Sequence, residues 1–158
     1  RFAGRVRTLR VFEDNALVRK VLEEEGAGQV LFVDGGGSLR TALLGGNLAR
    51  LAWERGWAGV VVHGAVRDTE ELRGVPIGLL ALAATPKQSA KEGKGEVDVP
   101  LKVLGVEVLP GSFLLADEDG LLLLPEPPSG VRSGGEGPPP GGRGGRAFRG
   151  GRPRGSRR

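Results

Sequence analysis

The sequence predicts one mixed α/β domain in which strands outnumber helices, followed by a basic tail. The chain has 158 residues, a length that suits a single domain. It has no cysteine, so the domain must fold without disulfides. Short apolar runs bounded by glycine or proline recur as far as Pro125, and more of them are typical of strands than of helices. Beyond Pro125 the only apolar side chains are those of Val131, Ala147 and Phe148. We therefore assign residues 1–127 to the domain and 128–158 to the tail.

The first half of the domain alternates strands with helices. No capping or lead-in pattern precedes the first strand, so we expect a domain that is shortened at its N-terminus. An asparagine precedes each of the two predicted helices and a glycine follows each, as caps do. The predicted elements are a strand at 5–12, a helix at 16–25 capped by Asn15, a buried strand at 29–34, a helix at 48–55 capped by Asn47, a buried strand at 58–63, a helical turn at 69–72 and a strand at 77–84.

The second half is rich in strands and poor in helices. Residues 87–96 are mostly Lys, Glu and Gly and predict an exposed loop. Residues 97–108 predict a pair of strands broken near Gly105. Two further apolar runs, at 113–116 and 121–124, predict strands joined by a tight acidic turn.

Charge is segregated between the domain and the tail. Residues 131–158 carry eight arginines and a single acid, Glu136, for a net charge of +7, although the whole chain carries only +4. The domain is therefore mildly acidic, at about −3. A glycine, proline and arginine composition cannot bury enough apolar surface to order a chain, so we expect the tail to be disordered. Its Arg-Gly-Gly repeats predict weak, nonspecific binding to RNA or other polyanions, and an extension without a function is an equal alternative.

Composition also excludes several classes of site. Without cysteine there is no thiolate nucleophile and no cysteine–zinc site. His63 is the single histidine, which excludes a histidine-rich metal centre. No apolar run is long enough to span a membrane and no signal-peptide pattern opens the chain, so we expect a cytoplasmic protein without membrane contact.

The strongest functional motif follows the buried strand at 58–63. Gly64 comes directly after it, and Arg67 and Asp68 stand side by side in the turn beyond. A guanidinium can clamp a carboxylate or an enolate, and a carboxylate can hold one face of a hydrated divalent cation. A surface ion pair at a strand end is the alternative, and the spacing alone leaves both open.

Two glycine-rich segments admit a binding role. The first, at 33–38, could cradle a phosphate after a strand, but no acid ends the next strand and no Walker lysine is present, so we interpret Asp34 as a turn former. The second comprises Gly45, Gly46, Asn47 and Leu48 at a helix start, where free backbone N–H groups suit a carboxylate. An ordinary cap by Asn47 is the alternative. We interpret four other features as structural: His63, Trp53, Trp57 and the acids of 117–119.

Several of these motifs occur together in one order: 35–38, 45–49, 56–61, 64–68, 106–111 and 116–120. That order resembles the RraA-like family, which includes the regulators of ribonuclease E activity and the class II 4-hydroxy-4-methyl-2-oxoglutarate aldolases. The resemblance covers residues 1–125. It implies a compact, β-rich α/β sandwich of the swivelling-domain type that forms a ring-shaped homotrimer with sites at subunit boundaries.

The resemblance also implies roles for individual residues. In the aldolase branch the backbone of Gly45, Gly46, Asn47 and Leu48 and the side chain of Arg67 would bind substrate, with Arg67 catalytic. Asp68 would hold a divalent metal, usually Mg²⁺. Family enzymes that decarboxylate oxaloacetate carry an aspartate at the position of Gly46, so this chain lacks one expected acid.

Two functions follow from the resemblance. The first is a metal-dependent lyase that cleaves 4-hydroxy-4-methyl-2-oxoglutarate to pyruvate and decarboxylates oxaloacetate through enolpyruvate. The alternative is a non-catalytic regulator that binds a ribonuclease. Asp68 favours the enzyme, because the ribonuclease regulators typically lack an acid after the arginine.

Overall fold

A computed structural model describes residues 1–128 of the chain, and the predicted tail therefore lies almost wholly outside the described residues. The described part contains ten strands and three helices, which confirms the predicted excess of strands. In chain order the elements are β1 (Phe2–Arg10), α1 (Ala16–Leu22), β2 (Val30–Asp34), β3 (Ala42–Leu44), α2 (Gly46–Glu54), β4 (Gly59–Val66), α3 (Thr69–Arg73), β5 (Gly78–Ala84), β6 (Glu96–Val97), β7 (Leu101–Val103), β8 (Val106–Val108), β9 (Phe113–Asp117) and β10 (Gly120–Leu124).

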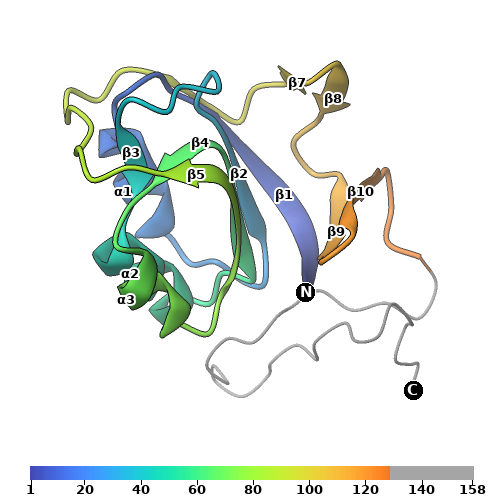
Figure 1. The fold of residues 1–158 in the computed structure, drawn as a ribbon. Helices are drawn as coiled ribbons and strands as arrows, with labels where there is room; N and C mark the ends of the chain where they lie inside the picture. Colours follow the sequence, from blue (N-terminus) through green and yellow to red (C-terminus); the bar gives the residue numbers. More distant parts are fainter. Residues whose placement is uncertain (129–158) are drawn as a thin grey trace.

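One eight-stranded sheet organises the fold, in the order β10-β9-β1-β2-β4-β3, with β5 also paired to β4 and β6 to β1. The pairs β1–β2, β2–β4, β3–β4 and β4–β5 are parallel, whereas β9 joins β1 antiparallel. Figure 1 shows the three helices gathered on one side of the parallel strands, with the hairpin β7–β8 and the sheet's own strands β9 and β10 beyond β1, away from the helices. The parallel strands therefore point their carboxyl ends toward one edge, where side chains from several strands can meet.

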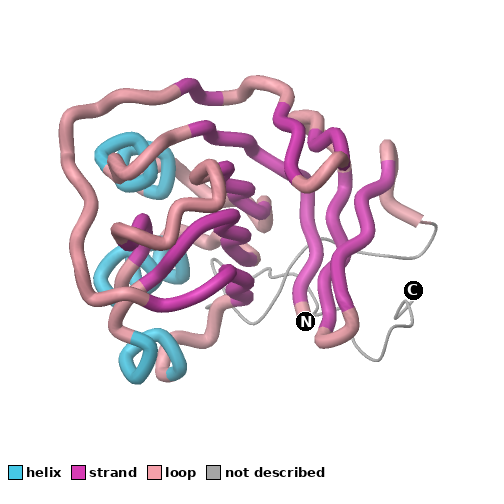
Figure 2. Tube along the Cα trace, turned by 45° about the horizontal axis from the view of Figure 1, so that its top comes forward, coloured by secondary structure: helices cyan, strands magenta, loops and turns pink. Residues whose placement is uncertain are grey.

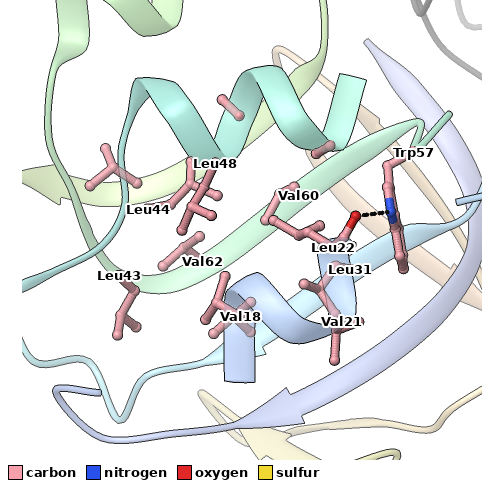
Figure 3. Packing of buried hydrophobic residues seen from close by; sticks show 14 of the residues in the cluster. Val18, Val21, Leu22, Leu31, Leu43, Leu44, Leu48, Trp57, Val60 and Val62 are labelled. Atoms are coloured by element: carbon pink, nitrogen blue, oxygen red, sulfur yellow. Dashed lines mark hydrogen bonds between the residues drawn. The ribbon is translucent and has the colours of Figure 1, made fainter. Parts of the chain in front are cut away.

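Strand β4 is buried on both faces, which is why its sequence is apolar apart from the half-buried His63. Val60 and Val62 pack into the core between the sheet and the helices, and Val61 packs into a second core on the opposite face. Figure 3 shows the first core, with Val18 and Leu22 of α1 facing Val60 and Val62 across the layer.

Trp57 closes one end of this core. Only 1% of its surface is exposed, and its indole N–H donates to the carbonyls of Leu22 and Glu24 at 3.3 and 3.2 Å. A helix leaves its last carbonyls without intrahelical partners, so one side chain both fills the core and satisfies the end of α1. The prediction that Trp57 is a packing residue is confirmed.

Several predicted boundaries are wrong. Helix α2 begins at Gly46 with Gly45 as its N-cap, so Asn47 is an exposed first-turn residue and caps nothing. Asn15 stands at the N-cap of α1 but makes no side-chain cap bond; Asp14 instead accepts from the Ala16 amide at 3.1 Å. Strand β4 continues through Gly64 to Val66.

A strap, residues 85–94, connects β5 to the β6 region and passes the ends of the parallel strands. The Thr85 amide donates to the Val66 carbonyl of β4, and the Lys87 carbonyl accepts from the Ala42 amide of β3. The exposed loop predicted at 87–96 overlaps this strap, which is mostly exposed, but Ser89 is buried and its hydroxyl donates to the Ala42 carbonyl at 2.7 Å. Figure 2 shows the strap as a long loop along the outside of the molecule.

Asp14 anchors the far end of the strap. It is 3% exposed, and its carboxylate accepts from the backbone amides of Glu92 and Gly93 at 2.9 and 3.1 Å. Burial alone would raise the pKa of Asp14, but the backbone amides of Ala16, Gly93, Glu92 and Lys94 outweigh it and hold the pKa below its ordinary value.

We expect Asp14→Asn to destabilise the protein at neutral pH by about 2 kcal/mol, because charge-assisted hydrogen bonds are lost. A depressed folded-state pKa stabilises the protein above the unfolded pKa of Asp, and this contribution disappears as the pH falls through the folded pKa. Urea unfolding of both proteins between pH 7 and pH 2 should therefore show their stabilities converging in acid. A difference that is constant with pH would contradict this role for the carboxylate.

None of the helices within residues 1–128 is long and apolar enough to cross a membrane.

Candidate functional site

The predicted site residues meet at the carboxyl edge of the sheet. Strand β4 ends at Val66 and delivers Arg67, while β3 ends at Leu44 and leads into α2. The Arg67 amide donates to the Leu44 carbonyl at 2.9 Å, which fixes the two strand ends beside each other. Strand β3 is not among the elements predicted from the sequence. It ends directly before Gly45 and Gly46, and its pairing with β4 places these two glycines beside Arg67.

Asp68 has a left-handed backbone, with φ 60° and ψ 47°. Non-glycine residues adopt this conformation at an energetic cost, and such residues concentrate at functional sites. The carboxylate of Asp68 accepts from the Gly46 amide at 3.3 Å and lies 3.3 Å from the Arg67 guanidinium. Both side chains keep about a third of their surface exposed, so they remain accessible to a small molecule. The two predicted key residues and one predicted binding amide are thus in direct contact.

Gly45 is required by this close approach. A Cβ at residue 45 would lie 2.9 Å from Asp68 Oδ2 and 3.2 Å from Arg67 Cγ, so any side chain would push the pair apart. The backbone of Gly45 is extended, a conformation that any residue can adopt. Glycine is therefore favoured here by the lack of space for a side chain.

Glu71 is the functional candidate that the sequence reasoning missed. A Cβ at Gly46 would lie 2.6 Å from Glu71 Oε1, so the Glu71 carboxylate occupies the space beside residue 46. The acid that was expected on residue 46 is thus replaced in space by an acid from α3. One signal was available: Glu71 follows Asp68 by three residues, and α3 begins at Thr69 directly after Asp68, so both acids belong to one short segment.

The N-terminus of α2 supplies the predicted backbone donors. The first turn of a helix leaves its amides without intrahelical acceptors, and here these include Gly46, Asn47 and Leu48. The Gly46 amide is already engaged by Asp68, whereas the Leu48 side chain is buried in the core and holds the helix start in place.

The other glycine-rich segment does not form a phosphate cradle. The amides of Gly35 and Gly37 donate to the His63 carbonyl, and the Gly36 amide donates to Asp34 Oδ1 at 2.9 Å. The last bond confirms Asp34 as a turn former. The ring of His63 lies against Gly37, and a structural role for His63 stays an interpretation.

The acids at the site suit a hydrated divalent cation rather than a cage of protein ligands. No group of three or more His, Cys, Asp or Glu side chains that could hold a metal occurs within residues 1–128. Mg²⁺ usually keeps several waters and takes one or two carboxylates. Asp68 and Glu71, which flank Gly45 and Gly46, fit that requirement.

Comparison with known proteins identifies the family. A family model described as "RraA-like: Aldolase/RraA" matches residues 1–123. The chain belongs to the RraA-like family. It is 98% identical over 135 residues to a Thermus thermophilus protein named 4-hydroxy-4-methyl-2-oxoglutarate aldolase, and the match covers 85% of this chain and 82% of that protein.

Solved structures share this family's fold. One, described as the RNA-processing inhibitor RraA from Thermus thermophilis, superposes with a TM-score of 0.81 at 97% identity and covers 85% of this chain and 82% of its own. Another, described as an S-adenosylmethionine: 2-dimethylmenaquinone methyltransferase from Geobacillus kaustophilus, has a TM-score of 0.79 at 49% identity and covers 80% and 79%. The family expected from the sequence motifs is confirmed, together with its sheet-rich mixed α/β fold, and the similar proteins carry both enzyme and regulator names.

Proposed function

We propose that the protein is a metal-dependent carbon–carbon lyase acting on small 2-oxo acids. Its reactions would be the cleavage of 4-hydroxy-4-methyl-2-oxoglutarate and the decarboxylation of oxaloacetate. The observation that carries the proposal is the cluster of Arg67, Asp68 and Glu71 around the start of α2. Relatives named as aldolases support the same reaction class.

Both reactions pass through the enolate of pyruvate, so one charge-stabilising site can perform both. The C3–C4 bond of the substrate breaks, its electron pair moves to the C2 oxygen, and protonation at C3 yields pyruvate. The other product is CO₂ from oxaloacetate or a second pyruvate from the hydroxy acid. Arg67 would stabilise the enolate oxygen, and the free amides of Asn47 and Leu48 would bind the carboxylate.

Two carboxylates divide the remaining roles. Asp68 would hold Mg²⁺, which as a Lewis acid would polarise the keto group of a bound substrate. Glu71, the second carboxylate at the site, would favour binding of the hydrated cation by its charge, and it would accept the proton of the C4 hydroxyl during cleavage of the hydroxy acid. The proposed site would therefore combine a carboxylate that holds a cation, a second carboxylate that accepts a proton and a guanidinium that stabilises an oxyanion, all beside the start of α2.

A pyruvate-release assay tests the proposal directly. Pyruvate formed from each substrate is measured with Mg²⁺ and with EDTA, beside a protein-free reaction that corrects for spontaneous decarboxylation of oxaloacetate. We expect release that depends on both protein and metal. Rates equal to the protein-free reaction at all metal concentrations would exclude the lyase.

The regulator function is the second candidate, favoured by the 97% identical structure described as an RNA-processing inhibitor. A protein that binds ribonuclease E in a pull-down and releases no pyruvate would establish it. The polyanion affinity of the tail lies outside the described residues and stays a prediction.

The ring-shaped homotrimer also remains a proposal. Exposed leucines on two edge strands support a covered surface: Leu82 of β5 is 51% exposed and Leu122 of β10 is 52% exposed.

A further inference from the structure

We propose that Arg50 is a positioning residue, which orients the Glu71 carboxylate toward the Gly45–Gly46 corner of the site. This inference rests on the proposed function, because it assigns the residue that holds one of its carboxylates. Arg50 touches neither Asp68 nor Arg67 through any hydrogen bond described for residues 1–128, so its effect would pass through Glu71.

The geometry divides the two oxygens of Glu71 between two tasks. The Arg50 guanidinium donates from Nη2 to Oε2 at 3.1 Å. The other oxygen, Oε1, lies beside Gly46, 2.6 Å from the position that a Cβ would take there. Arg50 lies one helical turn after Gly46 on α2, and Glu71 lies in the first turn of α3, so the bond also joins the two helices that build the site. One oxygen is fixed and the other is presented to the site.

Charge explains why Glu71 needs this partner. Asp68 and Glu71 flank the same glycine pair, and like charges placed so close repel each other. Each acid has an arginine: Arg67 lies beside Asp68, and Arg50 lies beside Glu71. Among the described residues, Arg50 is the only side chain that hydrogen-bonds Glu71. Without it, a half-exposed glutamate with several rotatable bonds would turn toward water, away from Asp68.

Two effects of removing Arg50 oppose each other at a cation site. Loss of a positive charge favours cation binding, but this charge is half-exposed and screened by water and salt. Loss of a group that orients a carboxylate disfavours cation binding, and outer-shell partners of metal ligands typically affect affinity by about tenfold or more. The orienting effect should therefore dominate as long as Glu71 is present.

A double-mutant cycle tests this inference with Mn²⁺ alone, measured by the electron paramagnetic resonance of free Mn²⁺ without substrate. We expect Arg50→Gln to weaken Mn²⁺ binding by about tenfold in the wild-type background. In the Glu71→Gln background the same substitution should leave affinity unchanged or raise it. Arg50→Lys should be intermediate, because a point charge can reach Oε2 but cannot fix its direction. Arg19→Gln is the matched control, since it removes a helix arginine from the exposed Arg19–Glu23 pair on α1.

The outcomes separate this inference from the proposed function. Equal effects of Arg50→Gln with and without Glu71, or tighter binding in the wild-type background, would overturn the role of Arg50. Coupling in Mn²⁺ binding without pyruvate release from oxaloacetate would leave Arg50 as the positioning residue and exclude the lyase. A wild-type protein that binds no Mn²⁺ would overturn both. Melting temperatures within a degree or two of wild type for all variants would show that the helices stay folded.

Discussion

Replacing Asp68 with asparagine is expected to reduce Mg²⁺-dependent decarboxylation of oxaloacetate by at least about a hundredfold, because the negative ligand of a hydrated cation is removed. The fold should survive for two reasons. Asparagine tolerates the left-handed backbone found at this position, and its side-chain oxygen can still accept from the Gly46 amide. Initial rates at a series of Mg²⁺ concentrations, measured by coupled detection of pyruvate, give the comparison.

Asp119→Asn is the control for this substitution. Asp119 lies in the exposed turn between β9 and β10, where Asp117 rather than Asp119 accepts the backbone amides. Its loss should not change the rate. Should Asp68→Asn decarboxylate as fast as wild type at equal Mg²⁺, the metal assignment would be wrong and Arg67 would have to carry the site without it.

Trp57→Ala should cause the largest loss of stability, about 3–5 kcal/mol, because it opens a cavity in the core between the sheet and the helices. It also leaves the carbonyls of Leu22 and Glu24 without their indole donor. Urea unfolding followed by circular dichroism measures the difference.

Trp57→Phe separates the two contributions. Phenylalanine keeps most of the apolar volume and loses only the N–H donor, so it should cost far less than alanine. If the phenylalanine and alanine variants were equally destabilised, the hydrogen bonds to the end of α1 rather than the volume of the ring would be the important term.

The strands were predictable where burial made the sequence uniform. The core segment of β4 shows an apolar run because both of its faces are covered. Its neighbour β2 and the more distant strand β9 show shorter versions of the same pattern. Strand β3 was missed because it has only three residues, too few for any periodicity. Its existence depends on pairing with the end of β4, which is a contact between residues distant in sequence.

Helix caps were less predictable, because neighbouring residues compete for the same amides. Asn15 and Asn47 both have the right chemistry for an N-cap, yet Asp14 accepts from the first amide of α1 and Asp68 from the first amide of α2. In each case a contact between residues distant in sequence decides which side chain accepts the amide. Asp14 is held by the strap, and Gly45 lies against Arg67 and Asp68.

Three properties could be derived from the order of residues alone: Arg67 and Asp68 adjoin after a buried strand, a glycine pair stands at a helix start, and the chain belongs to the RraA-like family. Each of them depends on neighbouring residues or on the order of motifs along the chain. The contact of Glu71 with Gly46, and the bond from Arg50 to Glu71, could be seen only in the folded protein. Helices α2 and α3 are separated by β4 in the chain, and they meet because β3 and β4 pair in parallel, which brings both helix starts to one edge of the sheet.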